Sequence, residues 1–464
     1  MPRSAAPEHA LGFATRQVHA GTVADGHGAR ATPIYLSAGF AFDDFDQAGE
    51  RFGTGGDGFT YTRVGNPTNA AVERRIAALE GGTEAILVGS GQAAVTVALL
   101  GLLQAGDHLL SASSIYEGSR GLFLENFSRL GIETGFVDDA NDADAWQRAI
   151  RPTTRALFIE SIPNPKNDLV DIALVAGVAH RNGIPLVVDN TFATPYLLRP
   201  LEHGADIVVH SASKFLAGHG SVLGGVIVDG GRFDWAAAPG QFPHLTEPAL
   251  ALGGQSYVDR FAGAAFISYA RSVVASRLGP TPSPLNAFLI QQGIETLSLR
   301  VDRQSASALA VARWLDEQQE VLSVDYSGLT SNPYNDLARR YLPNGQGSVF
   351  AFTVRGGVEA ARTFINAITL FTHMSHLGDV RSLILHPGST SHSLRTGEEL
   401  LAAGIWPGLL RVSIGVEDPA DLIRDLDSAL AAVRALNAAD DVIPTGSSPV
   451  NGAVPVSALA GERV

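Results

Sequence analysis

The sequence has no cysteine among its 464 residues, and it has no excess of basic charge. The absence of cysteine excludes disulfides, a thiol nucleophile and Cys-ligated metal sites, and it fits a reducing compartment. The formal net charge of -14 argues against nucleic acid or an anionic membrane as a partner, because both favour basic surfaces. No apolar run approaches the ~20 residues of a membrane helix, and the amino-terminal MPRSAAPEHALGF lacks the apolar segment of a signal peptide. We therefore expect a cytoplasmic protein.

Lysine is nearly absent as well, since Lys166 and Lys214 are the only lysines among 33 basic residues. Arginine can replace lysine on a solvated surface, but it cannot replace an amine that must lose its proton. A lysine in such an Arg-rich chain is therefore a candidate for chemistry. Lys166 lies in the polar turn NPKND, which is typical of an ordinary surface lysine, whereas Lys214 lies in HSASKFLAGHG, just after an apolar run.

Hydrophobic residues make up 45% of the chain, which is enough for large buried cores. From about residue 61, apolar runs alternate with helical stretches, which predicts an α/β fold with a mostly parallel sheet covered by helices. The length predicts two domains, of which the second is smaller and also α/β. The predicted strands include 84–88, 156–159, 184–188, 205–209, 222–228, 348–354 and 410–414, and the predicted helices include 69–80, 93–104 and 172–181. The predicted units are an extended N-terminal arm (1–60), a large domain (61–284, with an insertion at about 231–284), a C-terminal domain (285–437) and a disordered tail (438–464).

Lys214 and Asp189 each follow a predicted strand. Because ligands of open α/β sheets bind at the carboxyl ends of the strands, both side chains are candidates for one site. Enzymes that use pyridoxal 5'-phosphate (PLP) need a lysine that forms a Schiff base and an acid that keeps the pyridinium nitrogen protonated. Taken alone, Asp189 is explained equally well as a helix cap or a turn residue. Together, the two residues predict PLP on Lys214.

The segment VGSGQAAVTVALL places Ser90, Gly91 and Gln92 just before an apolar helix. Backbone N–H groups at a helix start bind phosphate, and glycine allows close approach. Ser211 and Ser213, which closely precede Lys214 in sequence, can add hydroxyl donors to an anion. A lone Ser-Gly before a helix is most often only a cap, so this interpretation depends on Lys214 and Asp189.

Several segments in one order resemble the Cys/Met-metabolism PLP enzymes, the relatives of cystathionine γ-synthase. They are YTRVGNPTNAAVERRIAALEGG, SGQAA, ESIPNPKNDLVDI, VVDNTFATPYLLRPLEHGADIVVHSASKFLAGHG and LRVSIGVED. The resemblance covers about residues 12–435. It implies PLP fold-type I, the aspartate-aminotransferase-like architecture, with a large domain and a smaller C-terminal α/β domain.

The resemblance also implies a role for each matching residue. Lys214 is the Schiff-base lysine and Asp189 the pyridinium partner, while Tyr116 stacks on the ring and Asn164 contacts its phenolic oxygen. The phosphate would be held by Ser90, Gly91, Gln92, Ser211 and Ser213, together with Tyr61 and Arg63 from a neighbouring subunit. Arg411 and Ser382 would bind the substrate carboxylate, for which a planar guanidinium is well suited. A shared site implies at least a homodimer, and the family's usual state is a homotetramer.

Three features favour the O-acetylhomoserine sulfhydrylase branch of methionine biosynthesis. Gln92 stands where lyases usually have methionine, GDVRSLILHPGSTSH resembles the sulfhydrylase pattern, and the stretch 231–284 resembles an insertion of that branch. The implied reaction is a γ-replacement, in which O-acetylhomoserine and sulfide, or a thiol, give homocysteine, or methionine, and acetate. Cystathionine γ-synthase, O-succinylhomoserine sulfhydrylase and methionine γ-lyase remain alternatives on the same scaffold. A nucleotide-binding module is the alternative outside this class, but no G-x-G-x-x-G follows a strand.

Two local features complete the sequence-based picture. Many relatives have Tyr-Gly-Gly or Tyr-Gly-Cys-Gly where this chain has Tyr116-Glu117-Gly118, which leaves the local loop shape and the substrate preference open. His386 and His392 have a spacing that could suggest a metal site, but no acidic residue lies between them. We therefore expect no metal.

Overall fold

The computed structural model describes residues 11–22, 25–52, 58–237 and 240–441. Its larger sheet has seven strands, five of which run parallel from β6 to β3, while β7 is antiparallel to both of its neighbours. In order across the sheet, the strands are β1 (Glu84–Val88), β7 (Gly225–Asp229), β6 (Ile207–Ser211), β5 (Leu186–Asp189), β4 (Thr154–Glu160), β2 (His108–Ala112) and β3 (Glu133–Val137). The mostly parallel sheet predicted from the sequence is confirmed.

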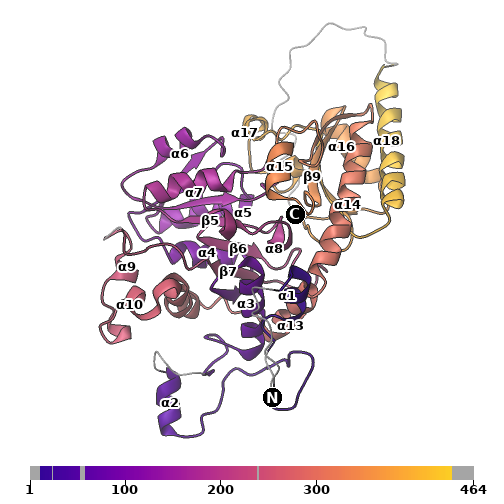
Figure 1. The fold of residues 1–464 in the computed structure, drawn as a ribbon. Helices are drawn as coiled ribbons and strands as arrows, with labels where there is room; N and C mark the ends of the chain where they lie inside the picture. Colours follow the sequence, from indigo (N-terminus) through magenta and orange to yellow (C-terminus); the bar gives the residue numbers. More distant parts are fainter. Residues whose placement is uncertain (1–10, 23–24, 53–57, 238–239, 442–464) are drawn as a thin grey trace, which may run out of the picture.

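Helices cover this sheet and bury its central strands (Figure 1). Strands that are buried on both faces read as continuous apolar runs, which is why the sequence showed β1, β4, β5, β6 and β7. It did not show the more polar edge strand β3, nor β2, which is buried but has the short run HLLSA with two polar residues. The helices of this region are α3 (Pro67–Glu80), α4 (Gly91–Leu100), α5 (Glu117–Gly121), α6 (Ala143–Ala149), α7 (Ile172–Arg181) and α8 (Thr194–Leu197). The predicted bounds of β1 and α7 agree with the structure, and most other bounds shift by one to four residues.

The segment after β7 forms short helical pieces rather than strands. Its α-helices are α9 (Pro243–Thr246), α10 (Tyr257–Phe261), α11 (Ala265–Tyr269) and α12 (Ser276–Leu278). Aromatic side chains of this segment pack on one another, with the ring centroid of Trp235 5.1 Å from that of Phe242 and 5.8 Å from that of Phe266. All three side chains belong to the same hydrophobic core as the strands of the large sheet. The interpretation of this segment as an insertion stays a prediction.

A second sheet of five strands has its own hydrophobic core and confirms the smaller C-terminal α/β domain. Its order is β10 (Thr372–His373), β11 (Leu383–Leu385), β12 (Leu409–Ser413), β9 (Val349–Val354) and β8 (Val321–Asp325). The helices that precede, connect and cover it are α13 (Pro284–Ile294), α14 (Leu297–Asp316), α15 (Asn335–Tyr341), α16 (Gly357–Ala367), α17 (Gly397–Ala402) and α18 (Pro419–Asp441). The long helix α14 joins the two cores, because Leu297 packs in the first and Leu315 in the second. The exact domain boundaries stay predictions.

The two ends of the chain differ from the sequence-based picture. The arm is not extended throughout, because it contains α1 (Phe13–His19) and α2 (Phe45–Phe52). α1 packs on the body, with Gln17 Nε2 donating to Ser298 Oγ at 2.9 Å, whereas α2 projects away from it (Figure 1). The predicted tail begins too early, since α18 continues to Asp441, and the rest of the tail lies outside the described residues. Among the helices described, none is long and apolar enough to cross a membrane.

Candidate active site

A cavity of about 610 Å³ lies at the carboxyl ends of three neighbouring parallel strands. Glu160, Asp189 and Ser211 are the last residues of β4, β5 and β6, and all three line it. Because parallel strands end at one edge of a sheet, this topology collects polar side chains from distant parts of the sequence. The C-terminal domain contributes to the lining through residues 374–377, Ser391 and Arg411.

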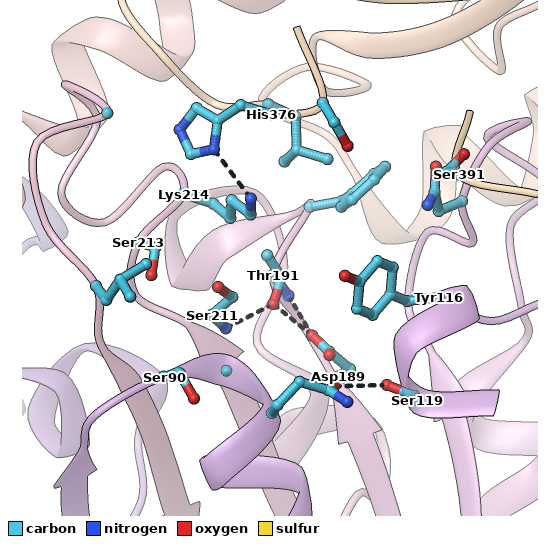
Figure 2. A pocket seen from close by; sticks show the side chains of 18 of the residues that line it. Ser90, Tyr116, Ser119, Asp189, Thr191, Ser211, Ser213, Lys214, His376 and Ser391 are labelled. Carbon is cyan, nitrogen blue, oxygen red and sulfur yellow. Dashed lines mark hydrogen bonds between the residues drawn. The ribbon is translucent and has the colours of Figure 1, made fainter. Parts of the chain in front are cut away.

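The Lys214 side chain enters this cavity from the segment that follows β6 (Figure 2). Its Nζ lies 3.0 Å from Nδ1 of His376. Burial, and then the positive charge of Arg411, lower the pKa of Lys214 to about 8. A sizeable fraction of the amine is therefore neutral near physiological pH. Lys166 has a different environment, because it lies within 4.0 Å of both Asp168 and Asp325, outside the cavity.

Asp189 is held by Thr191, a residue that sequence reasoning did not single out. The Thr191 backbone N–H and its hydroxyl donate to Asp189 Oδ1 at 2.9 and 2.5 Å. The same hydroxyl accepts from the Ser211 N–H at 2.8 Å, so Thr191 ties the end of β5 to the end of β6 (Figure 2). Burial raises the pKa of Asp189, while the Thr191 bonds and the charge of His210 oppose that shift.

A second buried acid, Glu160, shapes the same wall. Its carboxylate accepts from the Tyr116 N–H at 2.6 Å and from the Asn164 N–H at 3.3 Å. Burial, and then the nearby charge of Asp189, raise the pKa of Glu160. The signal that could have found Glu160 is its place at the end of an apolar strand, which is also the place of Asp189.

The start of α4 forms a cradle that is open to an anion. Ser90 caps the helix by accepting from the Ala93 N–H, and helix geometry leaves the N–H groups of Gly91 and Gln92 without an acceptor in their own helix. A Cβ on Gly91 would lie 2.6 Å from Cβ of Ser211, so only glycine fits here. Ser211 and Ser213 line the same cavity. The five residues predicted for phosphate binding are therefore brought together.

Tyr116 and Gln92 are connected through the first turn of α5. The Gln92 side chain donates to the Gly118 carbonyl at 2.8 Å, which places the turn beside the start of α4. Tyr116 precedes α5, and its half-exposed ring points into the cavity (Figure 2). A flat group in the cavity therefore has an aromatic wall available to it.

Glu117 does not line the cavity. Its carboxylate forms an ion pair with Arg395 and lies 3.6 Å from His392 Nε2. Both partners belong to the C-terminal domain, on the loop that also carries Ser391. The residue that departs from the family pattern therefore links α5 of the large domain to this loop.

Arg411 on β12 is buried, and no acidic side chain of the described residues lies within ion-pair distance of it. Its Nη1 donates to Asn164 Oδ1 and its Nη2 to the His376 carbonyl, each at 3.1 Å, while its Nε has no partner among the described residues. Burial lowers the pKa of Arg411 to about 10, so it remains charged. A buried, unneutralised guanidinium at a cavity is a site for an anion.

Several predicted residues lie elsewhere. Ser382 is fully buried outside the cavity, where its hydroxyl donates to Glu417 and accepts from the Gly415 N–H, each at 2.9 Å. We therefore no longer assign it to the substrate. Tyr61 and Arg63 do not line the cavity of their own chain either, and the Arg63 guanidinium lies 5.5 Å from the Tyr61 ring.

Of His386 and His392, whose spacing could suggest a metal site, His386 forms local hydrogen bonds within the C-terminal domain. His386 hydrogen-bonds Ser389 Oγ at 2.8 Å and the Pro407 carbonyl at 2.9 Å. In the part of the chain that the structure describes, no group of three or more His, Asp or Glu could hold a metal ion.

Comparisons with known proteins agree with this chemistry. O-acetyl-L-homoserine sulfhydrylase of Corynebacterium glutamicum is 43% identical over 91% of this chain and 97% of its own. Homocysteine synthase of Schizosaccharomyces pombe is 42% identical over 90% of this chain and 98% of its own. L-methionine gamma-lyase of Treponema denticola is 38% identical over 90% of this chain and 97% of its own.

A solved structure has the same architecture. It is a Campylobacter jejuni protein, provisionally named as an O-acetylhomoserine (thiol)-lyase, which contains N'-pyridoxyl-lysine-5'-monophosphate. The TM-score is 0.88, with 34% sequence identity over 91% of this chain and 100% of that chain. Residues 14–431 match the family described as Cys/Met metabolism PLP-dependent enzyme. The chain belongs to this family of PLP-dependent enzymes.

Proposed function

We propose that the protein is an O-acetylhomoserine sulfhydrylase, which exchanges the acetate of O-acetyl-L-homoserine for sulfide and releases L-homocysteine. The observation that carries the proposal is the buried guanidinium of Arg411, which faces the cavity of Lys214 without an acidic partner among the described residues. A zwitterionic amino acid supplies the carboxylate that this charge lacks. The sulfhydrylases of C. glutamicum and Leptospira meyeri, 43% and 42% identical to this chain, favour this member of the family.

The residues of the cavity fit pyridoxal phosphate. The cradle of Gly91 and Gln92 suits a phosphate, because its N–H groups have no acceptor within their own helix and a Cβ on Gly91 would collide with Ser211. Asp189 suits the protonated ring nitrogen, and Thr191 fixes its carboxylate. Lys214 suits the attachment point, since its pKa is lowered to about 8. When bound, PLP supplies the electron sink that makes the protons next to an amino group acidic.

The side chains of this chain then divide the remaining tasks. Arg411 binds the substrate carboxylate through a planar fork, and Asn164 and the His376 carbonyl keep that fork in place. The Lys214 amine accepts the α-proton at Nζ as a general base. A proton must also leave the β-carbon before the C–O bond to acetate breaks at the γ-carbon. The sulfide then forms the new S–C bond at that carbon, and the protons return.

We also propose that two chains share each active site, and that the enzyme is a tetramer made of two such dimers. The support is the position of Tyr61 and Arg63 outside the cavity of their own chain, directly after an arm with exposed apolar side chains. Leu36, Phe45 and Phe52 of this arm are 72%, 92% and 77% exposed in the single chain. A partner subunit would cover them and receive Tyr61 and Arg63 at its phosphate cradle.

We propose the cytoplasm as the location of the protein, in agreement with the absence of cysteine from the sequence.

The rival within the family is a γ-lyase, and the T. denticola relative shows that similarity alone does not separate the two. The test measures the products of one enzyme preparation. We expect O-acetylhomoserine and sulfide to give homocysteine much faster than methionine or homocysteine gives α-ketobutyrate. Dominant α-ketobutyrate release would instead make the protein a γ-lyase. O-succinylhomoserine and methanethiol, used in parallel reactions, identify the acyl group and the sulfur donor.

A further inference from the structure

His376 contacts the reactive amine, although nothing in its sequence context indicated a role. It lies between β10 and β11 of the C-terminal domain, whereas Lys214 follows β6 of the large domain. The two side chains meet in the cavity with Nδ1 and Nζ 3.0 Å apart (Figure 2). In the described part of the chain, Nζ has no other hydrogen-bond or ion-pair partner.

The imidazole of His376 is neutral under physiological conditions. Burial, followed by the charges of Lys214, Arg411 and Arg381, lowers its pKa to about 4, although Asp379 acts in the opposite direction. A neutral imidazole has one nitrogen that accepts and one that donates. A charged lysine has only donors, so Nδ1 must be the acceptor when Lys214 is protonated.

The backbone of His376 is also fixed. Its carbonyl accepts from Arg411 Nη2 at 3.1 Å, so the residue joins the guanidinium to the lysine amine. Its Nε2 is buried and has no partner among the described residues. The ring is therefore oriented mainly by its contact with Lys214, and that contact is its principal polar interaction.

We propose that His376 is a positioning residue, which accepts a hydrogen bond from Lys214 Nζ through Nδ1 and keeps the amine aimed into the cavity. This inference rests on the proposed role of Lys214 as the cofactor-binding amine. It does not depend on which homoserine ester or sulfur donor the enzyme uses. A hydrogen bond to a charged group favours the ammonium form, so His376 partly offsets the burial of Lys214.

The composition of the chain allows a direct test, because Lys166 and Lys214 are the only lysines. Lysine labelled with ¹³C at Cε gives two side-chain signals in the apoenzyme, and a Lys166→Arg variant assigns them. Each signal is titrated with pH in the wild type, in His376→Phe and in His376→Asn. Phenylalanine keeps a ring without an acceptor, whereas asparagine restores an acceptor oxygen.

We expect His376→Phe to lower the pKa of Lys214 by about one unit, because a charge-assisted hydrogen bond is lost. His376→Asn should keep it near the wild-type value, and the pKa of Lys166 should not move in either variant. An unchanged or raised Lys214 pKa in folded His376→Phe would overturn the proposal. The unaltered Lys166 signal and near-UV circular dichroism verify folding. If His376→Phe does not fold, His376→Leu takes its place under the same criterion.

A second measurement separates the effect of His376 on the orientation of the Lys214 amine from its effect on the pKa of that amine. The rate of pyridoxal phosphate capture by the apoenzyme is followed at a pH where Lys214 is deprotonated in every variant. Loss of orientation should make capture about tenfold slower in His376→Phe and should leave His376→Asn close to the wild type. Equal plateau rates in all three proteins would contradict positioning. An enzyme that behaves as a γ-lyase would refute the proposed function but would leave both of these results as expected.

Discussion

The guanidinium of Arg411 donates to the side-chain oxygen of Asn164 at 3.1 Å, and this bond connects the C-terminal domain to the wall of the cavity in the large domain. Asn164 is in turn held through its backbone N–H by Glu160, at the end of β4. The charge that would bind the substrate carboxylate is therefore oriented by the same wall that supports Tyr116. If Arg411 binds the substrate carboxylate as proposed, this bond would couple substrate binding to the relative position of the two domains.

Arg411→Lys tests the carboxylate contact. Lysine keeps a charge but loses the planar fork and the bond to Asn164, so both affinity and orientation should suffer. Hydrogen bonds to charged groups contribute about 1.5–3 kcal/mol, so we expect kcat/KM for O-acetylhomoserine to fall tenfold or more. The absorbance of the bound cofactor should be unchanged. An ordinary KM in this variant would show that the carboxylate binds elsewhere.

Capture of the cofactor by the apoenzyme should depend on pH. Burial and the charge of Arg411 lower the pKa of Lys214 from its ordinary value of 10.5 to about 8. Only the neutral amine attacks an aldehyde, so the rate should rise about tenfold per pH unit below that pKa and level off above it. Stopped-flow absorbance measures the rate. A rise that continues to about pH 10 would mean that Lys214 is not perturbed.

Glu117→Gln tests the link between α5 and the C-terminal loop. The carboxylate pairs with Arg395, and the two side chains are only 21% and 16% exposed. Loss of this pair should cost about 1 kcal/mol and raise KM by about fivefold, with little change in cofactor affinity. The matched control is Glu125→Gln, because Glu125 is exposed and lies in the helical turn directly after α5, so this substitution removes one negative charge nearby without breaking the Arg395 contact. Equal effects of the two substitutions would point to net charge rather than to the Arg395 contact.

The shared site predicts complementation between inactive variants. Tyr61→Phe or Arg63→Ala should weaken PLP retention without unfolding the chain. After verified subunit exchange with Lys214→Ala, part of the activity should return, because one of the two hybrid sites has all of its residues. Persistent inactivity of the mixed dimers would argue against a site built from two chains.

The sequence identified those residues of the cavity that lie in one contiguous segment or follow an apolar strand. Lys214, Asp189 and the Ser90–Gln92 segment were found in this way, and the structure places all of them around one cavity. Their roles in binding PLP stay predictions. The two-domain α/β fold was also predictable, because buried parallel strands have distinct apolar runs.

The contacts that depend on tertiary structure were not predictable. His376 reaches Lys214 from 162 positions away in the sequence, across the two domains. Thr191 carries no signal other than its place two residues after Asp189. Ser382 was misassigned for the converse reason, since a polar residue in a family-like segment turned out to satisfy Glu417 in the interior. Only the packing of the C-terminal domain decides which of its polar groups face the cavity.

The most direct test of the account identifies the residue that carries the cofactor. The holoenzyme is reduced with borohydride and digested, and mass spectrometry locates the pyridoxyl group. We predict one pyridoxyl group per chain on Lys214 and none on Lys166, and we predict that Lys214→Arg is unlabelled and nearly inactive, because guanidinium has no deprotonable amine. Label on Lys166, or ordinary activity in Lys214→Arg, would contradict the central claim.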